Sequence, residues 1–510
     1  MHPGAERILD EGDAFAPRLI GRLLEYSRAC LSEGGRHLVD VVDVEPEQGV
    51  ARRQWRLGHP ERDRRRARRK RDVHRLAVGR EPVAHLAAEA VAVERERGLH
   101  VGDLDDGKCG IDHHASCGRG YARRRGAATV AVVSDHISAT VADGVGHVTL
   151  DRPQALNALS YEMIRALTAV FEVWRDDTEV GVVVLDGAGE RGFCAGGDVR
   201  ELYEYASNDD HAEARRFFRA EYRLDAMIAR YPKPVVALMD GITMGGGIGL
   251  AGHAAIRVVT ERSRVAMPET RIGFTPDVGG SWLLARAPGE LGVHLALNSR
   301  TMDAADALHA GFADSFVPSE RLPHVLQALA ERADPGSPAE ILMLFDETPG
   351  PSALALARDW VDACYSAPTV GEIIDRLRAF ADGRSTAPTE NVSSSAFPRH
   401  PLDPEAAADA AAAADELEAL SPTALTLTLE SVRRARTLPS LEDALEQEFR
   451  LVSWFIEQHD LREGIRAQVI DKDRSPRWNP SSLADVEPGL AARVIDTPVD
   501  EPVWPGRGAA

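Results

Sequence analysis

The chain has 510 residues, with 60 lysines and arginines against 80 aspartates and glutamates, which gives a formal net charge of −20. Hydrophobic residues at 44% and charged residues at 27% are ordinary for a globular protein and exclude a collagen, a coiled-coil rod or wholesale disorder. At roughly 100–200 residues per domain, this length predicts about three domains. Five cysteines are too few for a disulfide scaffold in such a long chain, which favours a reducing compartment, and we expect the cytoplasm.

Charge divides the chain into two unequal parts. Residues 1–133, here called the leader, hold 25 basic and 21 acidic residues, a net charge of +4. The remainder holds 35 basic and 59 acidic residues, a net charge of −24. The leader has weak periodicity, lacks the apolar run of a secretory signal, and carries too much acid for a mitochondrial transit peptide. We expect an uncharacterised extension that is disordered or translated from a mis-assigned upstream start codon.

Two features of the leader have functional interpretations. The basic run Arg62–Arg71 is typical of a contact with nucleic acid or an anionic surface, but no aromatic platform or helix-turn-helix pattern accompanies it, which favours a solvated segment. Cys109, His113, His114 and Cys117 are possible zinc ligands. Their spacing matches no familiar zinc motif in a stretch already rich in histidine, so we expect coincidence and no metal site.

From about Ile137 the pattern becomes regular. Residues 138–141 and 147–151 are predicted strands around the turn signal Asp143-Gly144, which indicates a hairpin. Residues 160–174 carry apolar side chains at helical spacing, which predicts a helix with one buried face.

Two runs rich in β-branched and apolar residues, 180–186 and 235–239, are predicted strands buried on both faces, with a helical segment between them. Strands that alternate with helices indicate an α/β fold with crossover connections, which we place at residues 134–325. Residues 235–256 have nearly the length of a membrane span, but consecutive glycines at 245–247 suit a tight turn instead. Residues 326–510 are predicted to be a helical C-terminal region, in which 405–420 is a low-complexity helix or linker.

Two glycine-rich turns are the strongest candidates for chemistry: FCAGGDVR at 193–200 and DGITMGGGIGL at 240–250. Neither matches a phosphate-binding loop. Such turns expose backbone N–H groups, and two amides that converge on one carbonyl oxygen form an oxyanion hole. Taken alone, each turn is better explained as a structural bend than as a site.

Three motifs together resemble the crotonase (enoyl-CoA hydratase/isomerase) superfamily: AGGD at 195–198, KPVVALMDGITMGGG at 233–247 and MPET at 267–270. The resemblance implies an α/β fold, a crotonase-type spiral core of repeated ββα units followed by a helical C-terminal region. It implies that the amides of Gly197 and Gly246 polarise a thioester carbonyl. It also implies that the turn from Ala195 to Asp198 helps to bind coenzyme A.

The carboxylates narrow the resemblance to one subgroup. Family hydratases use two glutamates for acid–base chemistry, and the first of those positions is Gly249 here, while the second is Glu269. Asp277 appears in PDVGG, where hydratases usually have a small residue. This pattern resembles the 3-hydroxyisobutyryl-CoA hydrolase subgroup, as do SPTAL at 421–425, LEQEFRL at 445–451 and the tail at 459–480. The resemblance covers about residues 136–485.

The resemblance assigns roles to three acidic residues. Glu269 is implied to attack the thioester carbonyl or to activate a water molecule that does so. Asp277 is implied to orient the substrate hydroxyl, to assist proton transfer or to protonate the departing thiolate. Glu221 matches a substrate-contacting glutamate. The plainer alternatives are that Glu269 and Asp277 cap helices and that Glu221 is a surface charge.

Other polar residues of the core and tail have structural interpretations. His459, Asp460 and Arg466 are expected to tie the tail to the core, although they are also candidates for contacts with coenzyme A. Cys194 lies beside the first glycine turn without a histidine placed to activate it, so we expect a small buried side chain.

The resemblance therefore implies hydrolysis of a short branched 3-hydroxyacyl-CoA, most specifically 3-hydroxyisobutyryl-CoA, to the hydroxy acid and coenzyme A, a step of valine catabolism. The alternatives are an enoyl-CoA hydratase or isomerase on the same fold, and a catalytically silent CoA-binding protein. No metal or redox cofactor is expected, because coenzyme A is part of the substrate. The expected partner is the acyl-CoA, without nucleic acid or membrane, and a homo-oligomer is in keeping with the superfamily.

Overall fold

The computed structural model describes residues 38–44, 51–57, 129–331, 338–384 and 404–506. The chain divides into two compact units, Met1–Asp105 and Asp106–Ala510. In the first unit, β1 (Leu38–Val44) and β2 (Ala51–Leu57) form an antiparallel hairpin. The basic run at 62–71 and the cysteine and histidine group at 109–117 lie outside the described residues.

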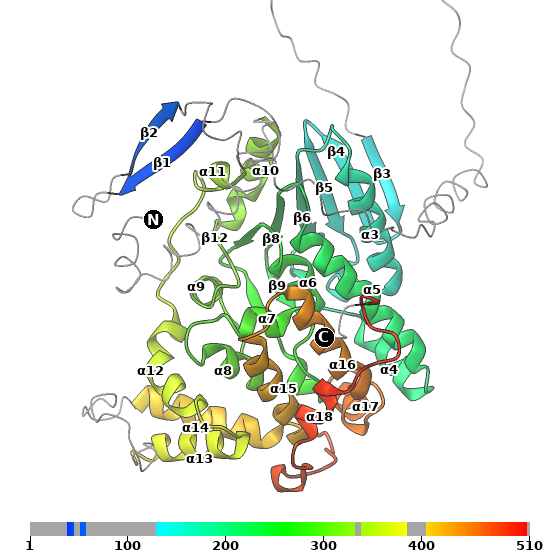
Figure 1. Cartoon of the computed structure of the whole chain (residues 1–510), viewed down its shortest axis with the longest axis vertical. Coiled ribbons are helices and arrows are strands. Elements are labelled where there is room, and N and C mark those ends of the chain that lie inside the picture. The colour runs from blue at the N-terminus through cyan, green and yellow to red at the C-terminus, as the bar shows by residue number, and fades with distance from the viewer. Residues whose placement is uncertain (1–37, 45–50, 58–128, 332–337, 385–403, 507–510) are drawn as a thin grey trace, which may run out of the picture. The chain divides into compact units, whose positions relative to one another are not determined.

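A seven-stranded sheet forms one layer of the second unit, in the order β12-β10-β8-β6-β5-β4-β3 (Figure 1). Its strands β3, β4 and β5 pair antiparallel, and those from β5 to β12 pair parallel. The predicted hairpin at Asp143-Gly144 is confirmed, with Asp143 at a φ of 50°. The strands are β3 (Thr129–Ser134), β4 (Ile137–Ala142), β5 (Val145–Leu150), β6 (Val182–Gly187), β8 (Val235–Met239), β10 (Ile256–Val259) and β12 (Ser315–Phe316).

A second, three-stranded parallel sheet has the order β11-β9-β7 and consists of β7 (Gly192–Cys194), β9 (Ile242–Met244) and β11 (Arg264–Ala266). Each of its strands follows one long strand of the first sheet, and helical turns follow in the chain. This is the ββα repeat that the resemblance implies. Because β7, β9 and β11 are parallel neighbours, the segments that follow them are brought to the same edge. The two glycine turns and Glu269 therefore lie side by side.

The helices of the core bury the faces that the sequence predicts. Helix α3 (Tyr161–Arg175) begins at the cap Ser160, whose side chain accepts a hydrogen bond from the Met163 amide, and it buries Leu167, Phe171 and Trp174. Apolar side chains of the seven-stranded sheet also pack against α10 and α11, so both of its faces are covered. The remaining core helices are α4 (Val199–Ser207), α5 (His211–Ala229), α6 (Gly246–Gly252), α7 (Gly280–Leu284), α8 (Leu291–Leu297), α9 (Ala304–His309), α10 (Leu322–Glu331) and α11 (Pro338–Leu342).

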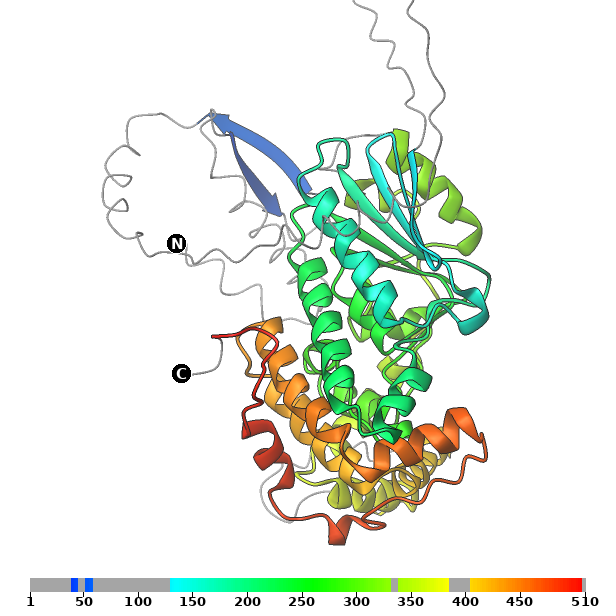
Figure 2. The same cartoon turned by 90° about the vertical axis from the view of Figure 1, so that its right-hand side faces the viewer.

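The C-terminal region is helical, as predicted: within the described ranges, every strand precedes residue 317. Figures 1 and 2 show the seven-stranded sheet at one end of this unit and these helices at the other. The low-complexity stretch is helix α14, which buries Ala410, Ala414 and Leu417. The helices are α12 (Ala353–Tyr365), α13 (Val370–Ala381), α14 (Pro404–Ala419), α15 (Pro422–Ala435), α16 (Leu441–Phe455), α17 (His459–Ile465) and α18 (Leu490–Asp496). Single turns are η2 (Pro153–Ala155), η3 (Glu269–Ile272), η4 (Ser319–Arg321), the π-helical η5 (Arg466–Ile470) and η6 (Leu483–Asp485).

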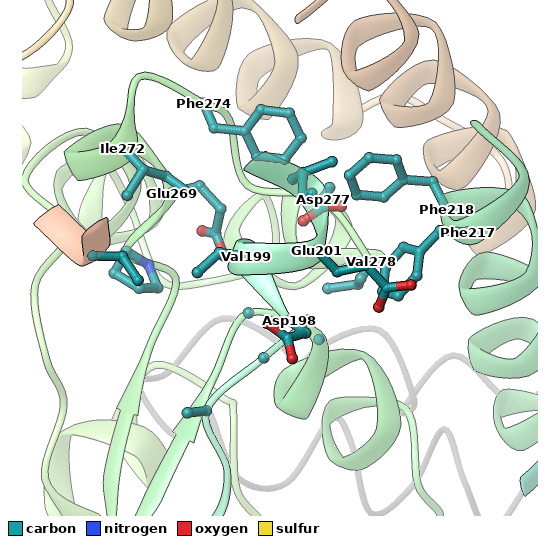
Figure 3. A pocket seen from close by; sticks show the side chains of 18 of the residues that line it. Asp198, Val199, Glu201, Phe217, Phe218, Glu269, Ile272, Phe274, Asp277 and Val278 are labelled. Atoms are coloured by element: carbon teal, nitrogen blue, oxygen red, sulfur yellow. The ribbon is translucent and has the colours of Figure 1, made fainter. Parts of the chain in front are cut away.

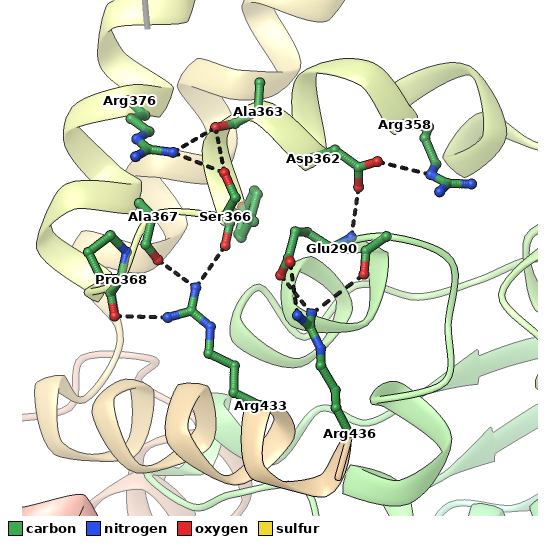
Figure 4. Close-up of polar contacts among 12 residues, drawn as sticks. Glu290, Arg358, Asp362, Ala363, Ser366, Ala367, Pro368, Arg376, Arg433 and Arg436 are labelled. Carbon is green, nitrogen blue, oxygen red and sulfur yellow. Dashed lines mark hydrogen bonds and ion pairs between the residues drawn. The ribbon is translucent and has the colours of Figure 1, made fainter. Parts of the chain in front are cut away.

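Arginines at the end of α15 join the C-terminal helices to the core (Figure 4). The Arg433 guanidinium donates to the carbonyls of Pro368 (2.8 Å) and Tyr365 (3.0 Å) at the end of α12. Arg436 pairs with Glu290 at 2.7 Å, and the amide of Glu290 donates to Asp362 of α12 at 2.7 Å. These contacts fix α15 against α12 and α8.

Residues 235–256 form β8, β9 and α6 and not a membrane span. Among the helices of the described residues, none combines the length and the apolar character needed to cross a membrane.

Three tail residues that the sequence singled out, His459, Asp460 and Arg466, hydrogen-bond to other segments of the C-terminal region. The buried Asp460 carboxylate accepts hydrogen bonds from Ser421 Oγ (2.5 Å) and the Asn479 amide (2.8 Å). His459 Nε2 donates to the Arg477 carbonyl at 2.9 Å, and Arg466 pairs with Glu463 at 2.8 Å. These contacts hold segments of the tail to one another and to the start of α15, so the structural role is seen within the C-terminal region, and a contact of these residues with coenzyme A stays a prediction.

We predict that Asp460→Ala lowers the free energy of unfolding by about 1–3 kcal/mol, because the buried Ser421 hydroxyl and the partly buried Asn479 amide lose their acceptor. Urea unfolding followed by circular dichroism measures the change. The control Asp382→Ala removes an exposed carboxylate paired with Arg384 and should change the free energy by at most about 0.5 kcal/mol. Equal effects of the two substitutions would contradict the anchoring role of Asp460.

Candidate active site

A pocket of about 270 Å³ opens where the two glycine turns meet helices α4 and α5. Its walls are mainly apolar, and its polar groups are mostly carboxyl groups. Figure 3 shows the Glu269 and Asp277 side chains facing the same space, with Phe218 and Phe274 beside Asp277. The lining includes Val199, Leu202, Phe217, Phe218, Ile272, Phe274, Val278 and Val469, together with Asp198, Glu201, Glu221, Glu269 and Asp277.

The two predicted oxyanion-hole amides lie close together. A Cβ atom added to Gly246 would lie 3.2 Å from the Gly197 nitrogen and 2.4 Å from Glu221 Oε1, so no side chain fits at Gly246. Gly246 is the first residue of α6, where an N–H group has no acceptor within the helix. Neither amide donates a hydrogen bond to any group in the described ranges. Both N–H groups are therefore available to a ligand oxygen.

The two predicted catalytic carboxylates flank these amides. Glu269 begins η3 directly after β11, and a Cβ atom added to Gly245 would lie 3.0 Å from its Oε1. Asp277 is also buried, and the Tyr222 hydroxyl donates to its Oδ2 at 2.8 Å. Neither carboxylate accepts a capping hydrogen bond, because η3 has Pro268 at its N-cap and α7 has Gly279. The helix-cap alternative for both residues is wrong.

Burial sets the protonation of the site. Desolvation raises the pKa of Asp277 to about 7, although the hydrogen bond from Tyr222 acts in the opposite direction. Desolvation and the nearby Asp277 raise the pKa of Glu269 well above its usual value. Within the described part of the chain, neither forms an ion pair that would offset its burial. Asp277 can therefore exchange a proton near neutral pH, and the Glu269 carboxyl group holds its proton more tightly than an exposed glutamate does.

Glu221 lies in the pocket, and the surface-charge alternative for it is wrong. Its side chain is on the buried face of α5 and is only 2% exposed. Its Oε1 has no hydrogen-bond partner among the described residues. Desolvation, followed by the charge of Asp277, raises its pKa well above the usual range of glutamate.

The other two predicted binding residues, Ala195 and Asp198, contribute mainly backbone groups to the pocket. The Ala195 amide donates to the Leu156 carbonyl at 3.0 Å. The Asp198 carboxylate caps α4 and pairs with Arg152 at 2.7 Å, so its charge is already engaged in the fold. Cys194 is fully buried and desolvation raises the pKa of its thiol to about 12, in agreement with the expected inert side chain.

Sequence reasoning missed a buried carboxyl group on α5. Asp225 is fully buried one helical turn after Glu221, and neither of its oxygens has a hydrogen-bond partner in the described ranges. A Cβ atom added to Gly249 would lie 2.8 Å from Asp225 Oδ2. The spacing of four residues between Glu221 and Asp225 was the available signal, because it places both on one helix face.

Sequence reasoning also missed the residue that supports Asp277. Glu448 of α16 accepts hydrogen bonds from the amides of Gly279 (2.7 Å) and Ser281 (2.9 Å). It thereby fixes the loop that follows Asp277. Although the motif LEQEFRL contains Glu448, the pairing spans 167 residues and has no local signal.

The C-terminal tail completes one wall of the pocket. Gln468 and Val469 of the π-helix η5 line it, and Arg200 of α4 donates to the Val469 carbonyl at 3.3 Å. The tail therefore belongs to the site through Gln468 and Val469, two residues that the sequence did not single out. Short π-helical segments occur frequently at functional sites.

Comparison with known proteins agrees with this geometry. The model of the enoyl-CoA hydratase/isomerase family matches residues 145–495. A relative from Danio rerio, named 3-hydroxyisobutyryl-CoA hydrolase, mitochondrial, is 39% identical over 349 residues, which cover 67% of this chain and 84% of the relative. The mitochondrial location is that of the relative, and the cytoplasmic location of this chain stays a prediction.

Two solved structures share the fold. A carnitinyl-CoA dehydratase from Mycobacterium thermoresistibile is 42% identical with a TM-score of 0.64, covering 73% of this chain and 99% of its own. An enoyl-CoA hydratase from Rhodobacter sphaeroides is 40% identical with a TM-score of 0.61, covering 71% and 97%. Relatives of similar identity thus carry names for different reactions, so the site residues must decide the chemistry.

We predict that the free energy of unfolding decreases as the pH rises from about 4 to about 7. The folded-state pKa of Asp277 is raised to about 7, so the folded chain holds this proton more tightly than the unfolded chain. This stabilisation is complete below about pH 4 and is lost as the pH passes through 7. Asp277 alone contributes up to about 4 kcal/mol.

Urea unfolding at pH 5 and pH 8 measures this dependence. Asp277→Asn should reduce the difference between the two values, whereas Glu418→Gln, an exposed change on α14, should preserve it. An unaltered difference in Asp277→Asn would show that burial does not perturb this carboxyl group.

Proposed function

The chain belongs to the enoyl-CoA hydratase/isomerase family, and we propose that it hydrolyses the thioester of a short branched 3-hydroxyacyl-CoA, in particular 3-hydroxyisobutyryl-CoA. One observation carries the proposal: the buried carboxyl groups of Glu269 and Asp277 flank the amides of Gly197 and Gly246, which donate to no group within the described residues, in a largely apolar pocket. These are the groups that acyl transfer requires, namely a nucleophile or base, a proton donor and an oxyanion site.

Position 249 favours hydrolysis over hydration. A hydratase of this family would carry a second glutamate there, but Gly249 has no side chain, and Asp225 occupies the space that a Cβ atom would need. The name of the Danio rerio relative supports the same choice of reaction. An enoyl-CoA hydratase is the second candidate, supported by the name of the Rhodobacter sphaeroides structure.

The proposed reaction begins when the Gly197 and Gly246 amides bind the thioester oxygen. The Glu269 carboxylate then attacks the carbonyl carbon, the C–S bond breaks, and the departing thiolate takes a proton. The resulting mixed anhydride is opened by water, which returns Glu269 to its carboxylate. In the alternative route, Glu269 removes a proton from water, that water attacks the carbonyl carbon directly, and the C–S bond breaks as the departing thiolate takes a proton.

Asp277 is suited to supply the proton. With a pKa of about 7 it holds a proton part of the time at neutral pH, and it can transfer that proton to the departing sulfur or donate a hydrogen bond to the 3-hydroxyl oxygen. The wall formed by Phe217, Phe218 and Phe274 suits a short branched apolar group. The same residues therefore support both the reaction and the acyl class.

We predict that the purified protein releases thiol from 3-hydroxyisobutyryl-CoA faster than from isobutyryl-CoA, because only the former offers a hydroxyl to the carboxyl groups. Glu269→Gln keeps the shape of the side chain but removes its basicity, and it should lower kcat by about 10³-fold or more. A thiol-reactive dye measures the release. Efficient hydration of crotonyl-CoA without thiol release would contradict the proposal and support the hydratase.

We further propose that the unit Asp106–Ala510 carries the activity by itself. The expected boundary at residue 134 falls inside the edge strand β3, which begins at Thr129, so a cut there would remove most of that strand. Deletion of residues 1–105 should leave kcat for thiol release within about twofold, because the pocket residues all lie in the second unit. Loss of activity in a folded truncated protein would assign a catalytic role to the leader.

A further inference from the structure

Glu221 has an unusual position for a carboxyl group. Its Oε1 lies 2.4 Å from the point that a Cβ atom of Gly246 would occupy, and that point is 3.2 Å from the Gly197 nitrogen. The oxygen lies in the pocket, is buried, and has no hydrogen-bond partner among the described residues. An acidic oxygen thus lies beside Gly246, whose amide is one of the two predicted donors of the oxyanion site.

An ionised carboxylate at this point would oppose catalysis. The amides of Gly197 and Gly246 are suited to bind an oxygen that gains negative charge in the transition state, and a second negative charge beside it would raise the energy of that state. A neutral carboxyl group has the opposite effect, because its O–H donates a hydrogen bond to the same oxygen.

The surroundings of Glu221 favour the neutral form. The titratable groups that interact with its charge are Asp225 and Tyr222 on α5, Asp277 and Glu269 beyond the glycine turn, and the thiol of Cys194. All five are acidic groups, and the one arginine that the described residues contribute to the pocket lining, Arg271, pairs with Glu416. Ion pairs in the described ranges do not include Glu221, and burial together with Asp277 raises its pKa.

We propose that Glu221 acts as a neutral acid and is the third hydrogen-bond donor of the oxyanion site, beside the amides of Gly197 and Gly246. It strengthens its hydrogen bond as negative charge develops on the thioester oxygen, and it does not need to lose its proton. For its kinetic test this inference rests on the proposed hydrolysis. Its spectroscopic test requires only that an acyl-CoA binds.

The kinetic test compares two substitutions that keep the length of the side chain. Glu221→Gln retains an N–H donor, whereas Glu221→Met retains only the shape. We expect Glu221→Met to lower kcat about 100-fold with little change in KM, and Glu221→Gln to stay within about tenfold of the unmodified chain. If Glu221 acted as an ionised base, the two substitutions would be equally damaging, and the inference would be wrong.

A comparison of two substrates shows whether Glu221 contacts the thioester oxygen or the 3-hydroxyl group. With isobutyryl-CoA, which lacks the hydroxyl, the ratio between the Glu221→Gln and Glu221→Met rates should remain as large as with 3-hydroxyisobutyryl-CoA. A ratio that falls to one would show that Glu221 contacts the hydroxyl, which would overturn the inference.

Difference infrared spectroscopy provides a readout without turnover. In a Glu269→Gln background with bound isobutyryl-CoA, the thioester C=O stretch should shift to lower frequency relative to free ligand. Adding Glu221→Met should reverse part of that shift, and adding Glu221→Gln should preserve it. The matched control Asp225→Asn changes a buried carboxyl group one turn away that does not line the pocket, and it should leave the band unmoved.

The two tests distinguish failure of the inference from failure of the proposed function. A chain that polarises the thioester through Glu221 but releases no thiol would refute hydrolysis and support the inference. A C=O band unaffected by Glu221→Met in a folded, ligand-bound protein would refute the inference even if thiol release is fast.

Discussion

Burial of carboxyl groups that have no partner cation among the described residues is the constraint on which this site depends. Glu221, Glu269 and Asp277 lie where the ends of the three-stranded sheet meet helix α5 and the C-terminal region, and burial removes most of the water from their charges. Desolvation therefore favours their neutral forms and brings their proton affinities toward the working range of an enzyme. The chemistry of the pocket follows from where the fold places these groups.

The parallel three-stranded sheet brings the reacting groups together. Strands β7, β9 and β11 end at one edge, so the turns at Gly197 and Gly246 and the start of η3 at Glu269 become neighbours although 72 residues separate the first from the last. Helix α16, which is distant in sequence, contacts the site through Glu448, whose hydrogen bonds fix the loop after Asp277. The helical C-terminal region is therefore a support of the site and not a separate appendage.

The shared framework decides membership of the family, whereas a few side chains in the pocket decide the reaction. The ββα repeat and the paired glycine turns are features of the shared framework, in which relatives with hydrolase, hydratase and dehydratase names occur. Reaction type depends on a few side chains around the bound thioester. In this chain, two helices differ from the hydratase pattern at this point. Gly249 on α6 has no side chain, and the Asp225 carboxyl group of α5 occupies the space beside it.

Local sequence determined the features that arise from short-range geometry. The hairpin at Asp143-Gly144, helix α3 and strand β8 follow from periodicity and turn chemistry within a few residues, and the motif residues identified the glycine turns. Only the tertiary structure decided that Tyr222 donates to Asp277, that Glu448 holds the following loop and that η5 closes the pocket. These contacts join segments up to 167 residues apart, and burial at such a junction depends on packing that no local pattern encodes.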